Sequence, residues 1–274
     1  MANMDSKVFY KYRPADDFTI ALLEKQEIKF SLAEEYNDPF DSKLIINVDS
    51  GTDRILQRLE DTPIDESEKQ NIRKRIKSGE INNDEYMKVA YQAAKRTIMS
   101  SCFAGNPENI LLWSHYADSH KGICVGIRDC SSTNIPAMKF DIKSCCTDPN
   151  GLRTDGLFPV YKVNYSDSGI VEWNPFNNDI KVFIDAHRNK AKCWEYEDEY
   201  RLIIPQGLFK TNILSFDSRF VVEIYLGCCI EAGYSKKVQQ IIKANYLDMG
   251  IAVKVFKLVP SKKSFTLEKE AMVI

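Results

Sequence analysis

Apolar runs with strand-like spacing dominate the chain from residue 98 onward. Runs of four to eight apolar or alternating residues, bounded by Gly, Pro, Asn or Asp, are typical of β-strands. Two longer segments with helical spacing interrupt them, near residues 179–192 and 234–246. The predicted strands are residues 98–103, 122–128, 138–142, 159–165, 196–204, 220–226 and 251–259.

The first fifty residues predict a strand, a helix and a second strand. Residues 9–12 and 27–31 have the strand pattern. Between them, Asp16 or Asp17 can begin a helix that runs through Glu24, because a carboxylate accepts hydrogen bonds from the free N–H groups of the first turn.

Residues 50–97 predict a block of helices. Pro63 suits a first helical position, and Asp65 can complete a capping box with Thr62. Gly79 would end that helix, and Asn83 can cap the next one. We interpret the block as a helical insertion over the core of a single α+β domain that spans residues 1–274. Long irregular connections and segregated helices favour this class over a doubly wound sheet.

Composition and charge narrow the class of protein. With 44% hydrophobic and 28% charged residues, the chain is neither disordered nor collagen-like. A net charge of −2 provides no general attraction to nucleic acid or to an anionic membrane. No apolar run approaches the roughly 20 residues that span a bilayer, and residues 1–7 lack the core of a signal peptide. We therefore expect a cytoplasmic protein with no membrane partner.

The cysteines indicate structural thiols. The chain has eight of them and no Cys-x-x-Cys pair, so the usual zinc spacing is missing. Adjacent cysteines, as at Cys145-Cys146 and Cys228-Cys229, have poor geometry for a mutual disulfide. We expect reduced thiols and no bound metal.

An acidic segment, residues 194–201, leads directly into the apolar run Leu202-Ile203-Ile204. If it is a strand, Glu195, Glu197 and Glu199 share one face with Arg201, because alternate side chains point the same way. The charges could simply protect an edge strand. Alternatively, two of the carboxylates have unequal pKa values, and one of them acts as a base or anchors a cationic transition state.

A second polar segment covers residues 100–120. Asn106-Pro107-Glu108 can begin a helix on which His115 and Tyr116 share a face. His115 and His120 are five residues apart, which departs from the spacing of helical metal ligands. His115 could equally make a structural hydrogen bond. No nucleophile-elbow glycine pattern accompanies the serines, which disfavours a hydrolase triad.

The opening strand carries cations on one face. Lys11 and Arg13 alternate there with Tyr10 and Tyr12. The segment is either an amphipathic edge strand or a cationic pair that binds phosphate, for which the guanidinium of Arg is well shaped.

Together these segments resemble the DUF2971 family, a bacterial family defined without an assigned function. The resemblance extends from about Phe9 to Val259 and implies no activity by itself. It depends on Tyr10-x-Tyr12-Arg13, Asn37-Asp38-Pro39-Phe40, Ser101-Cys102-Phe103, Leu112-Trp113-Ser114-His115-Tyr116-Ala117, His120-x-Gly122 and Trp194-x-Tyr196-Glu197-x-Glu199-x-Arg201.

The order of elements more distantly resembles the ADP-ribosyltransferase fold, including DNA-modifying toxins of the DarT kind. This resemblance implies a mixed or antiparallel β core and NAD as a substrate. It implies that Arg13 or Lys11 contacts the NAD phosphates and that Ser101 supports the nicotinamide-binding strand. It also implies that Glu199 is the catalytic acid.

The remaining roles follow from the same resemblance. Glu197, in a Glu-x-Glu spacing, would orient or deprotonate the acceptor. Tyr12, Trp113 or Tyr116 would stack on nicotinamide or adenine, and His115 lies among these cofactor-contacting residues. The chain departs from the pattern in two places, because the central motif is Ser-Ser-Cys-Phe rather than Ser-Thr-Ser and because Glu195 adds a third acid.

Three functions stay open on the sequence. The first is an ADP-ribosyltransferase that acts as a toxin or anti-phage defence effector on a protein or nucleic-acid acceptor, with a possible antitoxin or defence partner. The second is a non-catalytic binding or sensor domain in a defence or stress pathway. The third is a hydrolase or nuclease that uses His115, His120 and the acids.

Overall fold

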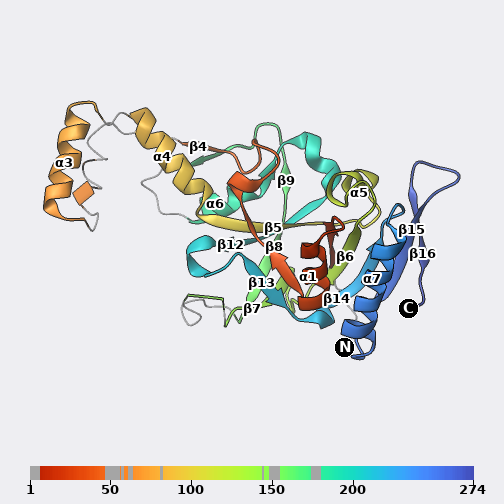
Figure 1. The fold of residues 1–274 in the computed structure, drawn as a ribbon. Helices are drawn as coiled ribbons and strands as arrows, with labels where there is room; N and C mark the ends of the chain where they lie inside the picture. The colour runs from red at the N-terminus through yellow and green to blue at the C-terminus, as the bar shows by residue number, and fades with distance from the viewer. Residues whose placement is uncertain are drawn as a thin grey trace.

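Short strands separated by helices make up the described part of the chain (Figure 1). The computed structural model describes residues 7–46, 56, 59–60, 64–80, 83–143, 145–147, 155–173 and 180–274. Its strands are β1 (Val8–Arg13), β2 (Glu27–Lys29), β3 (Ser31–Leu32), β4 (Leu44–Ile46), β5 (Ile98–Ala104), β6 (Ile123–Arg128), β7 (Ala137–Asp141), β8 (Leu157–Lys162), β9 (Asn164–Tyr165), β10 (Val171–Trp173), β11 (Asn189–Lys190), β12 (Glu199–Pro205), β13 (Ile213–Phe216), β14 (Val221–Leu226), β15 (Lys254–Pro260) and β16 (Leu267–Ala271).

The helices divide into α-helices and single turns. The α-helices are α1 (Asp17–Lys25), α3 (Glu66–Lys77), α4 (Asn83–Lys95), α5 (Ile110–Tyr116), α6 (Ile180–His187) and α7 (Ala232–Ile242). The short turns are η1 (Ala33–Glu35), η2 (Lys192–Glu197), η3 (Gln206–Leu208), η4 (Ser218–Phe220) and the π-helical turn η5 (Lys243–Leu247).

One large mixed sheet organises the molecule, as expected for the α+β class. Within the described residues, twelve strands join in the order β16-β15-β14-β6-β1-β5-β12-β8-β7-β13-β2, with β3 beside β5. Neighbours are antiparallel except β14 and β15. A single strand, β5, separates β1, which carries Lys11 and Arg13, from β12, which carries Glu199 and Arg201. Because Ala104 of β5 is opposite both Tyr10 and Glu199, those residues lie at the same level of the sheet.

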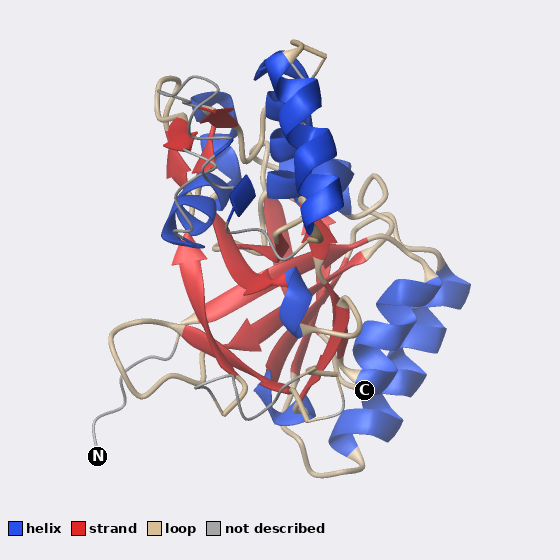
Figure 2. Ribbon diagram, turned by 90° about the vertical axis from the view of Figure 1, so that its left-hand side faces the viewer, coloured by secondary structure: helices blue, strands red, loops and turns tan. Residues whose placement is uncertain are grey.

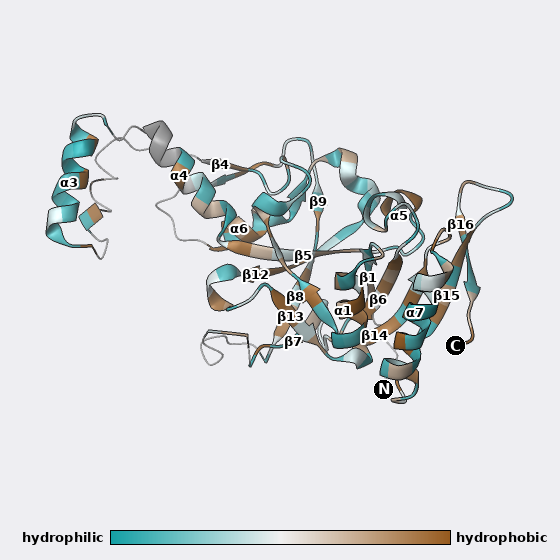
Figure 3. Cartoon of the chain, viewed as in Figure 1, coloured by the Kyte–Doolittle hydropathy of each residue, from teal (hydrophilic) through white to brown (hydrophobic). Residues whose placement is uncertain are grey.

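Helices lie outside the strands, which occupy the middle of the molecule (Figure 2). α1 and α7 pack together and contribute Leu23 and Ile242 to the largest core cluster. α5 contributes Leu112 and Trp113 to a second cluster, which lies against Tyr225 of β14. Hydrophobic residues concentrate on the strands (Figure 3). Packing of the two core clusters fixes where β1, β5 and β12 lie.

α3 and α4 form an arm within the helical region expected at residues 50–97. α3 lies far from the sheet and is mostly hydrophilic, and α4 leads back towards β5 (Figures 1 and 3). Asp65 caps α3 by accepting a hydrogen bond from the backbone N–H of Glu68 at 2.9 Å. Thr62 and Pro63, the proposed start signal, lie outside the described residues. α3 ends at Lys77, just before Gly79, whose φ is +74°.

The prediction of one continuous strand over residues 196–204 is wrong. The chain forms η2 up to Glu197, turns at Asp198 and begins β12 at Glu199. Asp198 adopts a left-handed φ of 43°, and its carbonyl oxygen accepts a hydrogen bond from the N–H of Gly105 at 2.9 Å. This turn removes Glu195 from the acidic row and leaves it exposed, while Glu197 and Glu199 stay buried.

Other differences lie at element ends and in short edge strands. The pattern did not predict β4, β10, β13 or β16, each of which has five residues or fewer. The helix expected over residues 179–192 ends at His187, and the chain continues into β11. Short strands leave little periodic signal, because their pairing partners are distant in sequence.

Gly122 lets β1 and the start of β6 approach closely. A Cβ atom at Gly122 would lie 2.0 Å from the carbonyl oxygen of Arg13. We expect Gly122→Ala to lower the free energy of unfolding by about 1–3 kcal/mol, because backbone must move to admit the methyl group. Urea unfolding followed by circular dichroism measures this loss.

Gly233→Ala in α7 is the control for that substitution. A Cβ there meets nothing within 4 Å, and alanine favours a helix, so we expect a gain of about 0.5–1 kcal/mol. Equal stabilities for the Gly122 variant and the wild type would show that the close approach does not constrain β1.

No helix among the described residues combines the length and the apolar character needed to cross a bilayer.

Candidate functional site

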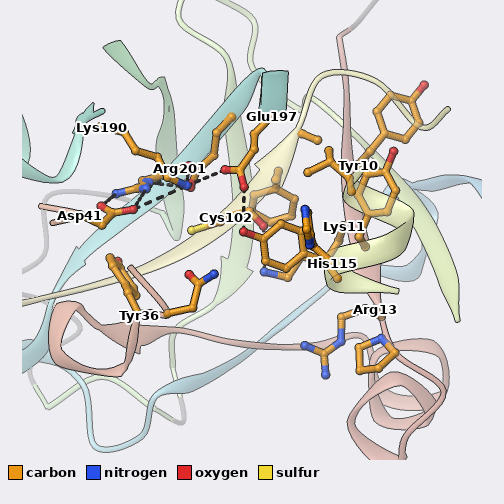
Figure 4. A pocket seen from close by; sticks show the side chains of 18 of the residues that line it. Tyr10, Lys11, Arg13, Tyr36, Asp41, Cys102, His115, Lys190, Glu197 and Arg201 are labelled. Atoms are coloured by element: carbon orange, nitrogen blue, oxygen red, sulfur yellow. Dashed lines mark hydrogen bonds and ion pairs between the residues drawn. The ribbon is translucent and has the colours of Figure 1, made fainter. Parts of the chain in front are cut away.

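A cavity of about 510 Å³ lies between β1, β5, β12 and the α5 segment. Seven of the nine residues proposed from the sequence line it: Lys11, Tyr12, Arg13, His115, Tyr116, Glu197 and Glu199. The sheet brings β1 and β12 to opposite sides of β5, and Leu112, His115 and Tyr116 of α5 also line the cavity. Figure 4 shows Glu197, Lys190, Arg201 and Asp41 gathered on one side of the cavity, with Lys11, Arg13 and His115 away from them.

Ser101 and Trp113 do not line the cavity. Ser101 is 2% exposed, and its Oγ accepts a hydrogen bond from Lys11 Nζ at 2.9 Å, so it acts on the cavity only through Lys11. Trp113 is fully buried, and its indole N–H donates to the carbonyl oxygen of Pro107 at 2.8 Å. The expectation that Trp113 stacks on nicotinamide or adenine is therefore corrected: the ring supports Tyr12 edge-on, at a centroid distance of 5.3 Å.

Glu199 is held in a buried ion-pair network. Its Oε1 accepts from Arg201 Nε at 2.7 Å, and its Oε2 accepts from Arg201 Nη2 at 3.0 Å and from Lys190 Nζ at 2.9 Å. Arg201 also donates two hydrogen bonds to the Asp41 carboxylate, at 2.8 and 2.6 Å. Glu199 and Arg201 are only 4% and 1% exposed, so these contacts are screened little by water.

Glu197 has a different set of partners. Its Oε2 accepts from Lys190 Nζ at 2.5 Å, and its Oε1 accepts from the Tyr116 hydroxyl at 2.7 Å (Figure 4). It therefore contacts one cation and one neutral group. Burial raises the pKa of Glu197 above its ordinary value despite the opposing effect of Lys190. For Glu199, burial also acts upward, but Arg201 and Lys190 outweigh it and hold its pKa well below the ordinary value.

The charges divide the cavity into two sides. The acidic side holds three carboxylates (Asp41, Glu197 and Glu199) against two cations (Lys190 and Arg201), which leaves one negative charge in excess. The other side carries Lys11 and Arg13 of β1. Arg13 has its nearest acidic partner, Asp16, at 3.6 Å, and its side chain is 24% exposed. The cavity can therefore bind a ligand that has a cationic part and an anionic part.

Several residues of the site were missed by sequence reasoning. Asp41 comes directly after Asn37-Asp38-Pro39-Phe40, a segment recognised from the sequence only as a motif of the family resemblance. Lys190 lies in β11, within a segment interpreted as helix. Tyr36 and Cys102 also line the cavity. The one available signal was the i, i+2 spacing of Glu199 and Arg201, which placed both on one strand face.

The two histidines of the second polar segment are not equivalent. His115 lines the cavity and is exposed. His120 lies outside the lining, stacks on Trp113 and makes a 3.1 Å hydrogen bond with the Ser114 hydroxyl through Nε2. No described histidine hydrogen-bonds to Glu197 or Glu199. Across the described ranges, no three His, Cys, Asp or Glu side chains are grouped to hold a metal ion. All eight cysteines are free thiols.

Comparisons of the chain with protein-family models, with curated proteins and with solved structures found no match. The resemblance to DUF2971 and to ADP-ribosyltransferases therefore stays a hypothesis, and the cavity itself has to support any function.

The low pKa of Glu199 makes stability depend on acid pH. Because folding lowers this pKa, the stabilisation is complete above the unfolded value of about 4.3 and is lost as pH falls towards the folded value. We expect the free energy of unfolding to fall less steeply between about pH 5 and pH 3 in Glu199→Gln than in the wild type. Urea unfolding at several pH values measures both slopes, and identical slopes would contradict the prediction.

Proposed function

We propose that this chain cleaves NAD and transfers the ADP-ribosyl group to a macromolecular acceptor. The observation that carries the proposal is the pair of buried carboxylates, Glu197 and Glu199, facing the cationic strand β1 across one cavity. NAD has a cationic nicotinamide ring and an anionic pyrophosphate, which match the two sides in charge. The cavity volume of about 510 Å³ falls in the usual range for ligand sites.

Glu197 is the better placed of the two acids to act on the substrate. Cleavage of the nicotinamide–ribose bond develops positive charge on the sugar, and a carboxylate bonded to a ribose hydroxyl stabilises that charge. Both oxygens of Glu199 are engaged by cations, so little of its charge is available to a ligand. Glu197 can exchange the Tyr116 hydroxyl for a ribose hydroxyl at the same oxygen. Glu199 and Lys190 then position Glu197.

Other residues that line the cavity match the pyrophosphate and the two ring systems of NAD. Arg13 can bond the pyrophosphate with its planar guanidinium. His115 and Tyr116 offer ring faces for nicotinamide or adenine. In the reaction an acceptor nucleophile forms a bond to ribose C1′, nicotinamide leaves with the bonding electrons, and the acceptor loses a proton. The proposal includes a protein or nucleic acid as the acceptor. It also includes a role as a toxin or anti-phage effector with an antitoxin partner.

NAD carrying a radioactive adenylate phosphate tests the activity. The protein is incubated with it, with and without cell lysate, and nicotinamide release and label on protein or nucleic acid are measured. Release together with transfer supports the proposal. The absence of release, of transfer and of any thermal shift on adding NAD would remove it.

A second function, a non-catalytic binding or sensor domain, is favoured by one specific observation. Asp41, Lys190, Glu199 and Arg201 satisfy one another, as in a structural network. A thermal shift with NAD that is unaccompanied by turnover, under any acceptor condition, would select this function. The hydrolase alternative needs a histidine bonded to Glu197 or Glu199, and the described residues contain no such contact.

A further inference from the structure

Two lysines border the same cavity in opposite surroundings. Lys190 contacts the carboxylates of Glu197 and Glu199 at 2.5 and 2.9 Å. Lys11 Nζ donates instead to the hydroxyl of Ser101 at 2.9 Å and to the carbonyl oxygen of Cys102 at 2.8 Å. Among the described residues, Lys11 forms no ion pair. One amine is thus held as a cation, and the other is held by neutral oxygens.

Lys11 loses its proton more readily than an ordinary lysine, because its amine is buried and has no paired carboxylate in the described part of the chain. Its Nζ lies over the Phe103 ring, 5.1 Å from the centre, a contact that favours the cation but is outweighed by burial. Burial lowers the pKa of Lys11 to about 8. The titratable groups that act on it are Cys102 on β5, Arg13 on its own strand and Glu199 on β12, while His115 and Asp118 reach the cavity from the α5 side. Burial raises the pKa of the Cys102 thiol to about 12, so that thiol stays neutral.

We propose that Lys11 is a nucleophilic amine that captures the aldehyde of a phosphorylated sugar as an imine, with Arg13 binding the phosphate. The two positions, i and i+2 on β1, lie on the same face of the strand and border the same cavity. Their Cα atoms are separated by roughly 6.6 Å, a span that a short sugar phosphate can bridge. Desolvation and a neighbouring cation are the two usual ways of activating a lysine.

The chemistry needs no oxidant or reductant. The nitrogen lone pair of Lys11 attacks the aldehyde carbon, and the carbonyl oxygen takes up a proton to give a carbinolamine. Loss of that hydroxyl as water, with the remaining amine proton, forms the C=N bond. The ring-opened forms of ribose 5-phosphate and of ADP-ribose share the required aldehyde and phosphate. The site does not depend on NAD cleavage, because either aldehyde can be supplied directly.

Reductive trapping tests the site in the full-length protein. The protein is incubated separately with ribose 5-phosphate, ADP-ribose and ribose in the presence of cyanoborohydride, and modified peptides are quantified by mass spectrometry. At pH 7.5 the neutral fraction of Lys11 is on the order of a hundredfold that of an ordinary lysine. We expect at least about tenfold more label on Lys11 than on Lys190 or on exposed Lys121. The difference in label is smaller than the difference in neutral amine, because a less basic amine is also a weaker nucleophile.

The three compounds and two variants separate the outcomes. Preference for ribose 5-phosphate indicates a free sugar phosphate, and preference for ADP-ribose indicates a nucleotide sugar. We expect Arg13→Gln to reduce labelling by both phosphates to the level seen with ribose. Lys11→Arg keeps a long basic side chain at this position, but a guanidinium cannot form the imine, so the label should be lost. Labelling of wild-type Lys11 no greater than that of exposed Lys121 would overturn the proposal.

Discussion

Replacing Glu197 with glutamine is expected to lower kcat for nicotinamide release from NAD by about 100- to 1,000-fold while the protein stays folded. The amide keeps the size of the side chain and one oxygen acceptor, but it removes the negative charge that would stabilise the sugar cation. Burial raises the pKa of Glu197, whereas the pKa of Glu199 is lowered, so the charge of Glu197 stabilises the folded state less. Its removal should therefore destabilise the fold less than the removal of the Glu199 charge. Initial rates of nicotinamide release at saturating NAD measure the effect.

Glu195→Gln is the matched control for that experiment. This substitution makes the same chemical change two residues away. Glu195 is exposed on η2 and lies outside the cavity lining. We expect the wild-type rate from this variant. Equal rates for the Glu195 and Glu197 variants would remove Glu197 from the reaction, and a large loss in Glu199→Gln alone would transfer its role to Glu199.

Replacing Arg201 with methionine is expected to lower the free energy of unfolding by about 3–5 kcal/mol. Arg201 is 1% exposed and donates to Glu199, to Asp41 and to the carbonyl oxygen of His187. Methionine fills much of the volume but deprives Asp41 and Glu199 of Arg201, so that Lys190 alone must compensate three buried carboxylates, those of Asp41, Glu197 and Glu199. Such uncompensated burial is what makes the loss of one ion-pair partner so destabilising. Urea unfolding monitored by circular dichroism and tryptophan fluorescence measures the change.

Arg219→Met provides the exposed comparison. Arg219 pairs with Asp217 at 2.5 Å, but its side chain is 77% exposed. When Arg219 is replaced, water and salt ions therefore screen the charge of Asp217. We expect essentially unchanged stability. Adding Glu199→Gln to Arg201→Met should recover part of the loss, because it removes one of the two stranded charges. A loss in Arg201→Met no larger than in Arg219→Met would show that the network does not stabilise the fold.

The side chains that share one face of a strand could be predicted without knowing which strands lie beside it. The i, i+2 spacing of Lys11 and Arg13 put both on one strand face, and the apolar run after residue 201 indicated a buried strand. Both conclusions need only local alternation, which a strand imposes on its own side chains. The same reasoning failed at Asp198, because its left-handed turn depends on Gly105 and Lys162, which are distant in the sequence.

Residue patterns alone predicted the α+β class, the helical arm and the charged segments that border the cavity. How those charges are paired depends on the tertiary structure. Asp41 reaches Arg201 from a turn, and Lys190 reaches Glu199 from a two-residue strand; neither element carries a periodic signal. The structure also buried Trp113 and separated the partners of Glu197 from those of Glu199. Ion pairing in a cavity depends on distances of a few ångströms between segments far apart in the chain, and packing of the whole sheet sets those distances.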